Sequence, residues 1–173
     1  MPQTSVAEPR PYLVLIGAPA AGKTRLGKRV AKLLSVPFID TDKRIVARHG
    51  VIAEIFAEHG EAHFRQLERD EVVTALHESA VVALGGGAVL DVQTQRDLAG
   101  HRVVMLTVSA QAVEARITSG KRPLVAGIDS WKALVESRRE LYEKLSTRTF
   151  DTSHRPLDEI AADIVSWIKE ENP

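Results

Sequence analysis

A glycine-rich segment near the N-terminus carries the residue types that bind phosphate groups. Gly17 is followed, after four residues, by Gly22, Lys23 and Thr24, which is the Gly-x-x-x-x-Gly-Lys-Ser/Thr pattern of a phosphate-binding loop. An apolar run precedes the segment and a helical pattern follows it, as this motif requires. The alternative is a glycine turn that happens to precede a helix. Because every fixed position matches, we expect the chain to bind a nucleoside triphosphate, ATP.

Each part of this loop has its own physical role. Backbone N–H groups of the loop form a cradle for an anion, and the helix that follows presents its positive end to the same anion. Lys23 adds a mobile positive charge for the outer phosphates, and the hydroxyl of Thr24 can ligate Mg²⁺. The residues expected to bind ATP are Gly17, Ala20, Ala21, Gly22, Lys23 and Thr24.

Further polar residues fall where a substrate could bind beside the nucleotide. Asp40 and Asp42 follow a short apolar run, and carboxylates just past a buried strand lie in the crevice where open α/β sheets bind ligands. A triple glycine at 85–87 ends another apolar run, which suggests that backbone approaches a ligand closely. Arginines are usually solvated, but several near one crevice suit a small substrate with a carboxylate and hydroxyls. The arginines in question are Arg65, Arg122 and Arg138.

Strands and helices alternate along the chain and would position these residues. Apolar runs predict strands at residues 12–16, 36–39, 80–84, 102–108 and, more briefly, 149–151. Helical periodicity follows at residues 25–34, 43–58 with an interruption at Gly50, 61–77, 130–145 and 157–168, with shorter helices before Gly100 and after Ser109. Strands that are apolar on both faces indicate a parallel sheet covered on both sides. The expected fold is a three-layer α/β/α phosphate-binding-loop kinase fold with about five parallel strands.

Composition limits the classes of protein that the chain can belong to. Its 173 residues fit one domain, and 23 basic against 23 acidic residues give no reason to expect a nucleic-acid or membrane partner. There is no cysteine, which fits a reducing cytoplasm, and no apolar run approaches the ~20 residues that span a bilayer. We expect residues 1–10 to be a short disordered segment. Residues 11–173 are expected to form a single kinase domain with a loop at about 118–129.

Taken together, the motifs resemble those of the shikimate kinase family. They occur in the family's order and at similar spacing over roughly residues 13–168, and the Asp-Thr-Asp, Gly-Gly-Gly and Arg-Pro-Leu set is far more specific than the phosphate-binding loop. The matching motifs are Gly17 to Thr24, Phe38-Ile39-Asp40-Thr41-Asp42, Ile55-Phe56, Gly60-Glu61, Phe64-Arg65, Leu84-Gly85-Gly86-Gly87-Ala88, Lys121-Arg122-Pro123-Leu124, and Arg138 with Leu141-Tyr142. The resemblance implies a cytoplasmic, monomeric enzyme that transfers phosphate from ATP to the 3-hydroxyl of shikimate, a precursor of aromatic amino acids.

The resemblance also implies roles for individual residues. Asp42 would hydrogen-bond the ring hydroxyls near the 3-hydroxyl, as its orienter and an available base, and Arg65 with Arg138 would clamp the carboxylate. Phe56 and Phe64 would pack against the ring. The shikimate pocket would be lined by the backbone of Gly85, Gly86 and Gly87.

On the nucleotide side, the resemblance implies that Asp40 holds the Mg²⁺ shell through water, opposite Thr24. Arg122 would come from a lid at about 118–126 and reach the transferred phosphoryl group. Arg116 and Arg155 match the residues that flank adenine. The catalytic set would therefore be Lys23, Asp42 and Arg122.

Two departures from the family and three alternatives remain open in the sequence. Ala20 stands where the family usually has glycine, so it is strained if that position needs a positive φ. The spacing between Arg116 and Arg122 is about one residue shorter than usual. A gluconate-type or small nucleotide kinase would share the fold, and a non-catalytic ligand-binding relative would share the pocket. His59 and His63 have the spacing of two metal ligands on a helix, although solvated histidines are the commoner outcome.

Overall fold

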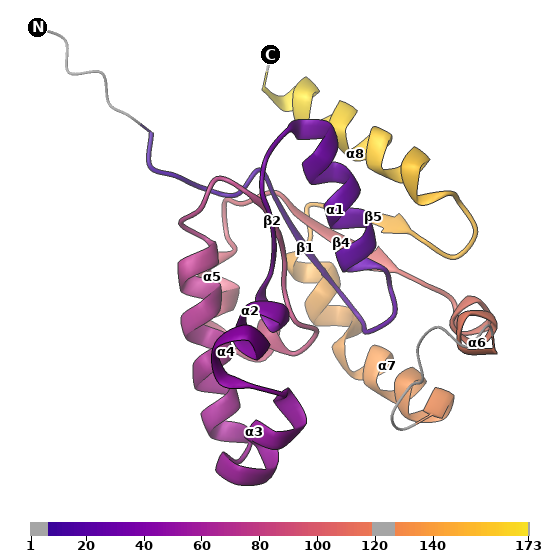
Figure 1. Cartoon of the computed structure of the whole chain (residues 1–173). Coiled ribbons are helices and arrows are strands. Elements are labelled where there is room, and N and C mark those ends of the chain that lie inside the picture. The colour runs from indigo at the N-terminus through magenta and orange to yellow at the C-terminus, as the bar shows by residue number, and fades with distance from the viewer. Residues whose placement is uncertain (1–6, 119–126, 173) are drawn as a thin grey trace, which may run out of the picture.

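The computed structural model describes residues 7–118 and 127–172 and has a five-stranded sheet at its centre (Figure 1). The strand order is β2 (Phe38–Asp40), β3 (Val81–Ala83), β1 (Leu13–Gly17), β4 (Val103–Thr107), β5 (Arg148–Asp151). Every neighbouring pair is parallel. The predicted parallel α/β sheet is therefore confirmed, including the short strand near residue 150.

Helices cover both faces of this sheet and form the outer layers (Figure 1). One face packs against α1 (Lys23–Leu34) and α8 (Leu157–Glu171). The other packs against α4 (Glu61–Ala75), the 3₁₀ turn η1 (Ala88–Leu90), α5 (Val92–Asp97) and α7 (Gly127–Leu145). None of the helices in the described part of the chain is long and apolar enough to cross a membrane.

The apolar runs in the strands follow from this arrangement. Successive side chains of a strand point to opposite faces of the sheet. In β1, Leu13 and Leu15 join the core beneath α1 and α8, whereas Val14 and Ile16 join the core beneath α4 and α7. Since both faces are covered by helices, neither position can be polar, and the strand reads as a continuous hydrophobic run.

Two short helices between β2 and α4 form a small unit at one side of the sheet. They are α2 (Thr41–His49) and α3 (Ile52–His59), and the interruption predicted at Gly50 is confirmed by its φ of 92°. A separate apolar cluster of Ile45, Ile55 and Phe64 joins α2, α3 and α4. This cluster is distinct from the two sheet cores.

The segment after β4 differs slightly from its predicted form. The helix α6 (Ala110–Thr118) begins after Ser109, whose hydroxyl oxygen accepts a hydrogen bond from the backbone N–H of Ala112 at 3.1 Å. The predicted loop at 118–129 ends early, since α7 already begins at Gly127. The predicted lid residues 119–126, Arg122 among them, lie outside the described residues.

Candidate active site

The candidate functional residues meet at the carboxyl-terminal edge of the sheet. The loop at 17–22 follows β1, Asp40 ends β2 with Asp42 just beyond it in α2, and the triple glycine follows β3. These three strands are neighbours in the sheet, so their following segments lie side by side at one edge. This edge is where open α/β sheets bind their ligands.

The phosphate-binding loop has a backbone that two glycines make possible. A Cβ on Gly17 (φ 145°) would collide with the carbonyl oxygen of Leu106 on the neighbouring strand. Gly22 (φ 92°) caps α1 in a left-handed conformation, and among the described residues no side chain occupies the N–H groups at the start of that helix. These N–H groups and the helix dipole therefore remain available for an anion.

Lys23 turns back onto the loop that precedes it. Its ammonium donates to the carbonyl oxygens of Gly17 at 2.6 Å and Ala18 at 3.0 Å. Burial lowers the pKa of Lys23 to about 8, and the carboxylates of Asp42 and Asp40 partly oppose this shift. The charge thus lies at the mouth of the phosphate cradle, beside both candidate carboxylates.

Ala20 adopts the strained conformation that the sequence left open. Its φ is 68°, in the left-handed region that is costly for residues other than glycine. Side chains from two helices hold the loop here: Trp131 Nε1 of α7 donates to the carbonyl of Pro19 at 2.7 Å, and Arg116 of α6 donates to the carbonyl of Ala20 at 2.9 Å. Strained backbone persists where its surroundings over-determine it, as they do here.

Ala20→Gly is therefore expected to stabilise the protein, by up to about 1 kcal/mol, because glycine adopts positive φ without the Cβ penalty. The gain is limited by the greater flexibility of glycine in the unfolded chain. Urea unfolding measures the change. The control is Ala162→Gly, at an exposed position of α8, which should cost about 0.5–1 kcal/mol. Similar losses in the two variants would contradict strain at Ala20.

Thr24 and Asp40 supply oxygen atoms of the kind that Mg²⁺ prefers. The Thr24 hydroxyl donates to Asp40 Oδ2 at 2.6 Å, and Asp40 Oδ1 accepts the backbone N–H of Lys43 at 3.1 Å, which caps α2. Mg²⁺ is bound through one or two protein oxygens, with waters and phosphates as its other ligands. Within the described residues, no group of three or more His, Cys, Asp or Glu side chains could hold a metal. The ring centroids of His59 and His63 lie 4.8 Å apart, with the rings tilted by 47°.

Asp42 presents an acceptor that the rest of the described chain does not use. Its Oδ1 is buried and has no hydrogen-bond partner there. Burial is the main cause that raises the pKa of Asp42, the charge of Asp40 adds to it, and Lys23 and Arg65 oppose it. A buried acceptor without a partner is costly, so this oxygen suits the hydroxyl of a ligand.

Two of the three glycines make room for a charged side chain of the site, and the third lies against another. A Cβ on Gly85 would collide with the Asp42 carboxylate, and one on Gly87 would collide with the Arg65 guanidinium. A Cβ on Gly86 would lie 3.4 Å from the Arg138 guanidinium. The structure therefore brings together the predicted carboxylate and both predicted carboxylate-binding arginines along one backbone segment.

The predicted ring-packing residues and several unpredicted ones complete this side of the site. The Phe56 and Phe64 rings lie 4.8 Å apart, and the Arg65 guanidinium lies 5.4 Å from the Phe64 ring. Sequence reasoning missed Glu68, and it gave no role to Tyr142 or Thr41, which it had quoted only as parts of motifs. Glu68 accepts from Arg65 at 2.7 Å, Tyr142 donates to the Gly86 carbonyl at 2.7 Å, and the Thr41 hydroxyl accepts the Gly85 N–H at 3.1 Å.

Glu68 had a signal in the sequence that could have found it. It lies three residues after Arg65, the spacing at which side chains on a helix meet. Its side chain is almost fully buried, and burial raises its pKa although Arg65 opposes the shift. Arg65 is therefore held by a carboxylate on its own helix and points toward the glycines with a fixed orientation.

The two predicted adenine-flanking arginines are placed differently. Arg116 lines a cleft of about 380 Å³ between α6 and the segment after β5, together with Gln111, Ala112, Ala115, Ser153 and His154. Arg155 is half exposed and pairs with Asp163 of α8 at 2.8 Å, and it does not line this cleft. The structure thus brings only Arg116 to the phosphate-binding loop.

The fold and this crevice define a phosphate-binding-loop kinase that acts on a small molecule. A family model described as "Shikimate kinase" matches residues 19–169. A shikimate kinase of Thermobifida fusca is 46% identical over 157 residues, with 88% of this chain and 91% of the relative covered. One of Mycobacterium tuberculosis is 42% identical, with 94% and 96% covered.

Solved structures agree with these relatives. The shikimate kinase of Acinetobacter baumannii in complex with shikimate superposes with a TM-score of 0.83 at 27% identity, with 95% of each chain covered. The chain belongs to the shikimate kinase family. It is thus a phosphotransferase with shikimate kinase activity that uses ATP, and the gluconate-type and nucleotide-type alternatives are set aside.

Proposed function

We propose that phosphoryl transfer from ATP to the 3-hydroxyl of shikimate takes place in the crevice between the phosphate-binding loop and the triple glycine. The observation that carries this proposal is the set of three side chains against the glycines, namely Asp42, Arg138 and Arg65. One carboxylate and two guanidinium groups complement a small ring that bears hydroxyls and a carboxylate. The catalytic residues would be Lys23, Asp42 and Arg122.

Arg65 and Arg138 would bind the carboxylate of shikimate. They come from different helices, α4 and α7, and reach neighbouring glycines, so a carboxylate between them can accept hydrogen bonds from both. Glu68 fixes the direction of Arg65 through its 2.7 Å contact. Phe56 and Phe64 would supply an apolar wall beside the ring, whose backbone wall is formed by Gly85, Gly86 and Gly87.

Asp42 would accept a hydrogen bond from the hydroxyl that is phosphorylated. Its unpartnered oxygen is buried, and Lys23 lies near enough to oppose the rise of its pKa. Positive charge near Asp42 favours its ionised form, which can accept a hydroxyl proton. Phosphoryl transfer otherwise needs mainly alignment and neutralisation of charge.

The loop and its neighbours would hold ATP. The N–H groups of residues 17–22 would bind the phosphates, with Lys23 exchanging its two carbonyl partners for phosphate oxygens. Thr24, with Asp40 acting through water, would hold Mg²⁺, which would neutralise charge on the phosphates. The cleft beside Arg116 would take the adenine ring. Arg122, the lid and a role for Arg155 at adenine stay predictions.

The proposal includes the cellular setting of the enzyme. We propose a cytoplasmic monomer that acts without nucleic-acid or membrane partners. The equal totals of 23 basic and 23 acidic residues and the absence of cysteine support the location and the lack of polyanionic partners.

The test of the proposed pocket is the separate replacement of its two arginines. Arg65→Ala and Arg138→Ala should each raise the KM for shikimate about ten- to a hundredfold, since each removes a charge-assisted bond worth about 1.5–3 kcal/mol. The KM for ATP should change much less. Shikimate-dependent ADP release measures both constants.

Arg139→Ala is the matched control for this test. Arg139 follows Arg138 on α7, is half exposed and pairs with Glu136 at 2.9 Å, so its loss should leave both KM values unchanged. If Arg65→Ala or Arg138→Ala weakened ATP and shikimate equally, these arginines would belong to the nucleotide side and the proposed pocket would be wrong.

A further inference from the structure

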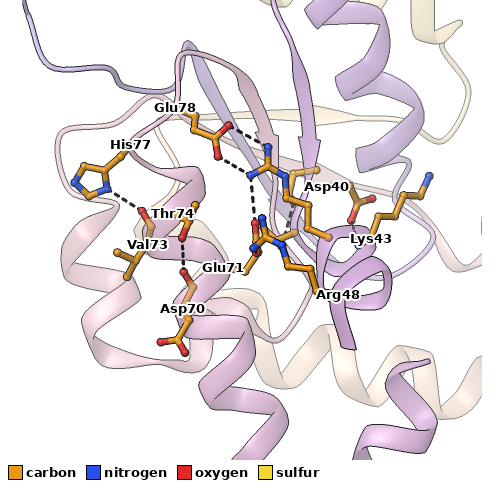
Figure 2. Close-up of polar contacts among 12 residues, drawn as sticks. Asp40, Lys43, Arg48, Asp70, Glu71, Val73, Thr74, His77 and Glu78 are labelled. Carbon is orange, nitrogen blue, oxygen red and sulfur yellow. Dashed lines mark hydrogen bonds and ion pairs between the residues drawn. The ribbon is translucent and has the colours of Figure 1, made fainter. Parts of the chain in front are cut away.

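A network of four charged side chains joins α2 to α4 and to the segment just after α4, where Glu78 lies (Figure 2). Arg48 Nη1 lies 2.5 Å from Glu71 Oε2, and Arg44 Nη1 lies 3.3 Å from Glu71 Oε1. Arg44 also holds Glu78 with two hydrogen bonds, at 2.5 and 3.0 Å. Two positive and two negative charges therefore balance, with Glu71 between the two arginines.

Glu71 is the buried member of this network. Its side chain is 4% exposed, whereas those of Arg44 and Arg48 are 29% and 54% exposed. A buried carboxylate that loses its partners carries a large desolvation penalty. The helix α2 therefore cannot slide or rotate against α4 without leaving Glu71 without one of its arginines, and the network favours one arrangement of the two helices.

The two joined helices carry opposite ends of the candidate shikimate pocket. Asp42 lies in the first turn of α2, two residues before Arg44. On α4, Arg65 and Glu71 are six residues apart, less than two helical turns, and Glu68, which accepts from Arg65, lies between them in the sequence. Besides this network, Ile45 of α2 and Phe64 of α4 belong to one apolar cluster with Ile55 of α3. The separation of Asp42 and Arg65 thus depends on how α2 docks on α4.

We propose that Glu71 is a positioning residue for shikimate: through Arg44 and Arg48 it holds α2 against α4, so that Asp42 and Arg65 lie at the separation that the substrate requires. Glu71 does not touch the substrate. This inference rests on the proposed placement of shikimate between Asp42 and Arg65. It concerns residues for which the family resemblance implies no role.

Two variants with opposite charge changes test the proposal. Glu71→Gln removes a negative charge, and Arg48→Gln removes a positive one. If the network acts by position, both should raise the KM for shikimate about three- to thirtyfold, as remote contacts do when they modulate binding. The KM for ATP should change less than about twofold, and kcat should fall with the rise in shikimate KM, because a displaced Asp42 orients the acceptor hydroxyl less well. The double variant should cost less than the two single effects combined, because both break one contact.

The signs of the two KM changes distinguish an effect of position from an electrostatic effect that acts through space. Shikimate is an anion, so Glu71→Gln would tighten its binding and Arg48→Gln would weaken it if charge alone acted at a distance. Effects of opposite sign, or unchanged shikimate KM values in both variants, would overturn the proposal. Arg48 is half exposed, so the Arg48→Gln variant should fold even if Glu71→Gln unfolds.

A matched control excludes general loss of stability. Glu171→Gln breaks another ion pair, between Arg102 and α8 at 2.9 Å, in helix α8, which carries none of the proposed shikimate-binding residues. It should leave the shikimate KM unchanged, and an equal rise there would overturn the proposal. Arg65→Ala keeps the two hypotheses distinguishable. If Arg65→Ala raises the shikimate KM and the network variants do not, the positioning role of Glu71 is wrong and the proposed pocket stands. If Arg65→Ala has no effect, the proposed pocket itself is wrong.

Discussion

Lys23→Ala is expected to lower kcat by about a thousandfold or more while the protein stays folded. Loss of one preorganised donor to a developing charge costs about 10²–10³ in kcat, and Lys23 adds a full positive charge on the transferring phosphoryl group. Within residues 7–118 and 127–172, its ammonium donates hydrogen bonds only to loop carbonyls, those of Gly17 and Ala18. Thermal unfolding and steady-state ADP release measure the two effects. Near-normal turnover in a folded variant would refute the role of the loop.

The pH dependence of ATP binding gives this role a second, independent readout. Burial lowers the pKa of Lys23 to about 8, so in the free enzyme the charge is present below pH 8 and is lost as the pH rises above it. The KM for ATP should therefore stay level below pH 8 and rise toward tenfold for each unit above it. In Lys23→Ala this rise should be absent, whereas Lys28→Ala, at an exposed position of α1, should retain it.

The sign of the matching stability change follows from the same shift. A lysine whose pKa is lower in the folded state binds more protons when unfolded, so the free energy of unfolding rises with pH. For Lys23 this rise falls between about pH 8 and the usual lysine value of about 10.4. Lys23→Ala should remove the rise. A parallel rise in the variant would mean that other groups cause it.

The sequence predicted those features that depend on local pattern. The apolar runs became strands because both sheet faces are covered, and the loop pattern of Gly17 to Thr24 lies between strand and helix as expected. Asp42 and the triple glycine lie together because the parallel neighbours β2 and β3 deliver their following segments to one edge of the sheet. The identity of the glycines was also informative, since Gly85 and Gly87 leave space for charged side chains.

Features that depend on contacts between distant segments could not be predicted. The φ of Ala20 is set by Arg116 and Trp131, which lie 96 and more residues away in the chain. No role was assigned to Arg44, Arg48 or Glu71 from the sequence, and only the docking of α2 on α4 shows that Glu71 is buried between the two arginines. The periodicity of apolar residues indicates which face of a helix is buried. It does not indicate which side chain will pair with a buried charge.

Asp42→Asn is expected to lower kcat about 10²–10⁴-fold, the usual contribution of a positioned acid or base. Asparagine keeps the size of the side chain and one acceptor oxygen, but it loses the negative charge. Shikimate binding measured by calorimetry without nucleotide should weaken as well, because the orphaned oxygen of Asp42 lies in the proposed pocket. Asp70→Asn, at an exposed position of α4, should change neither quantity. An unchanged shikimate affinity in Asp42→Asn would place Asp42 outside the pocket.

The same substitution should make the protein more stable at neutral pH. Burial and the charge of Asp40 raise the pKa of Asp42, so the folded state binds more protons than the unfolded chain, whose aspartates titrate near about 3.9. The free energy of unfolding therefore falls as the pH rises from about 3.9 through the folded pKa, and the penalty persists above it. Asparagine has no such penalty. Asp42→Asn should melt above the parent protein at pH 8, and the difference should narrow as the pH approaches 4. If the variant melted lower than the parent at pH 8, the ionised carboxylate would stabilise the fold. The buried oxygen of Asp42 would then cost no stability, contrary to this prediction.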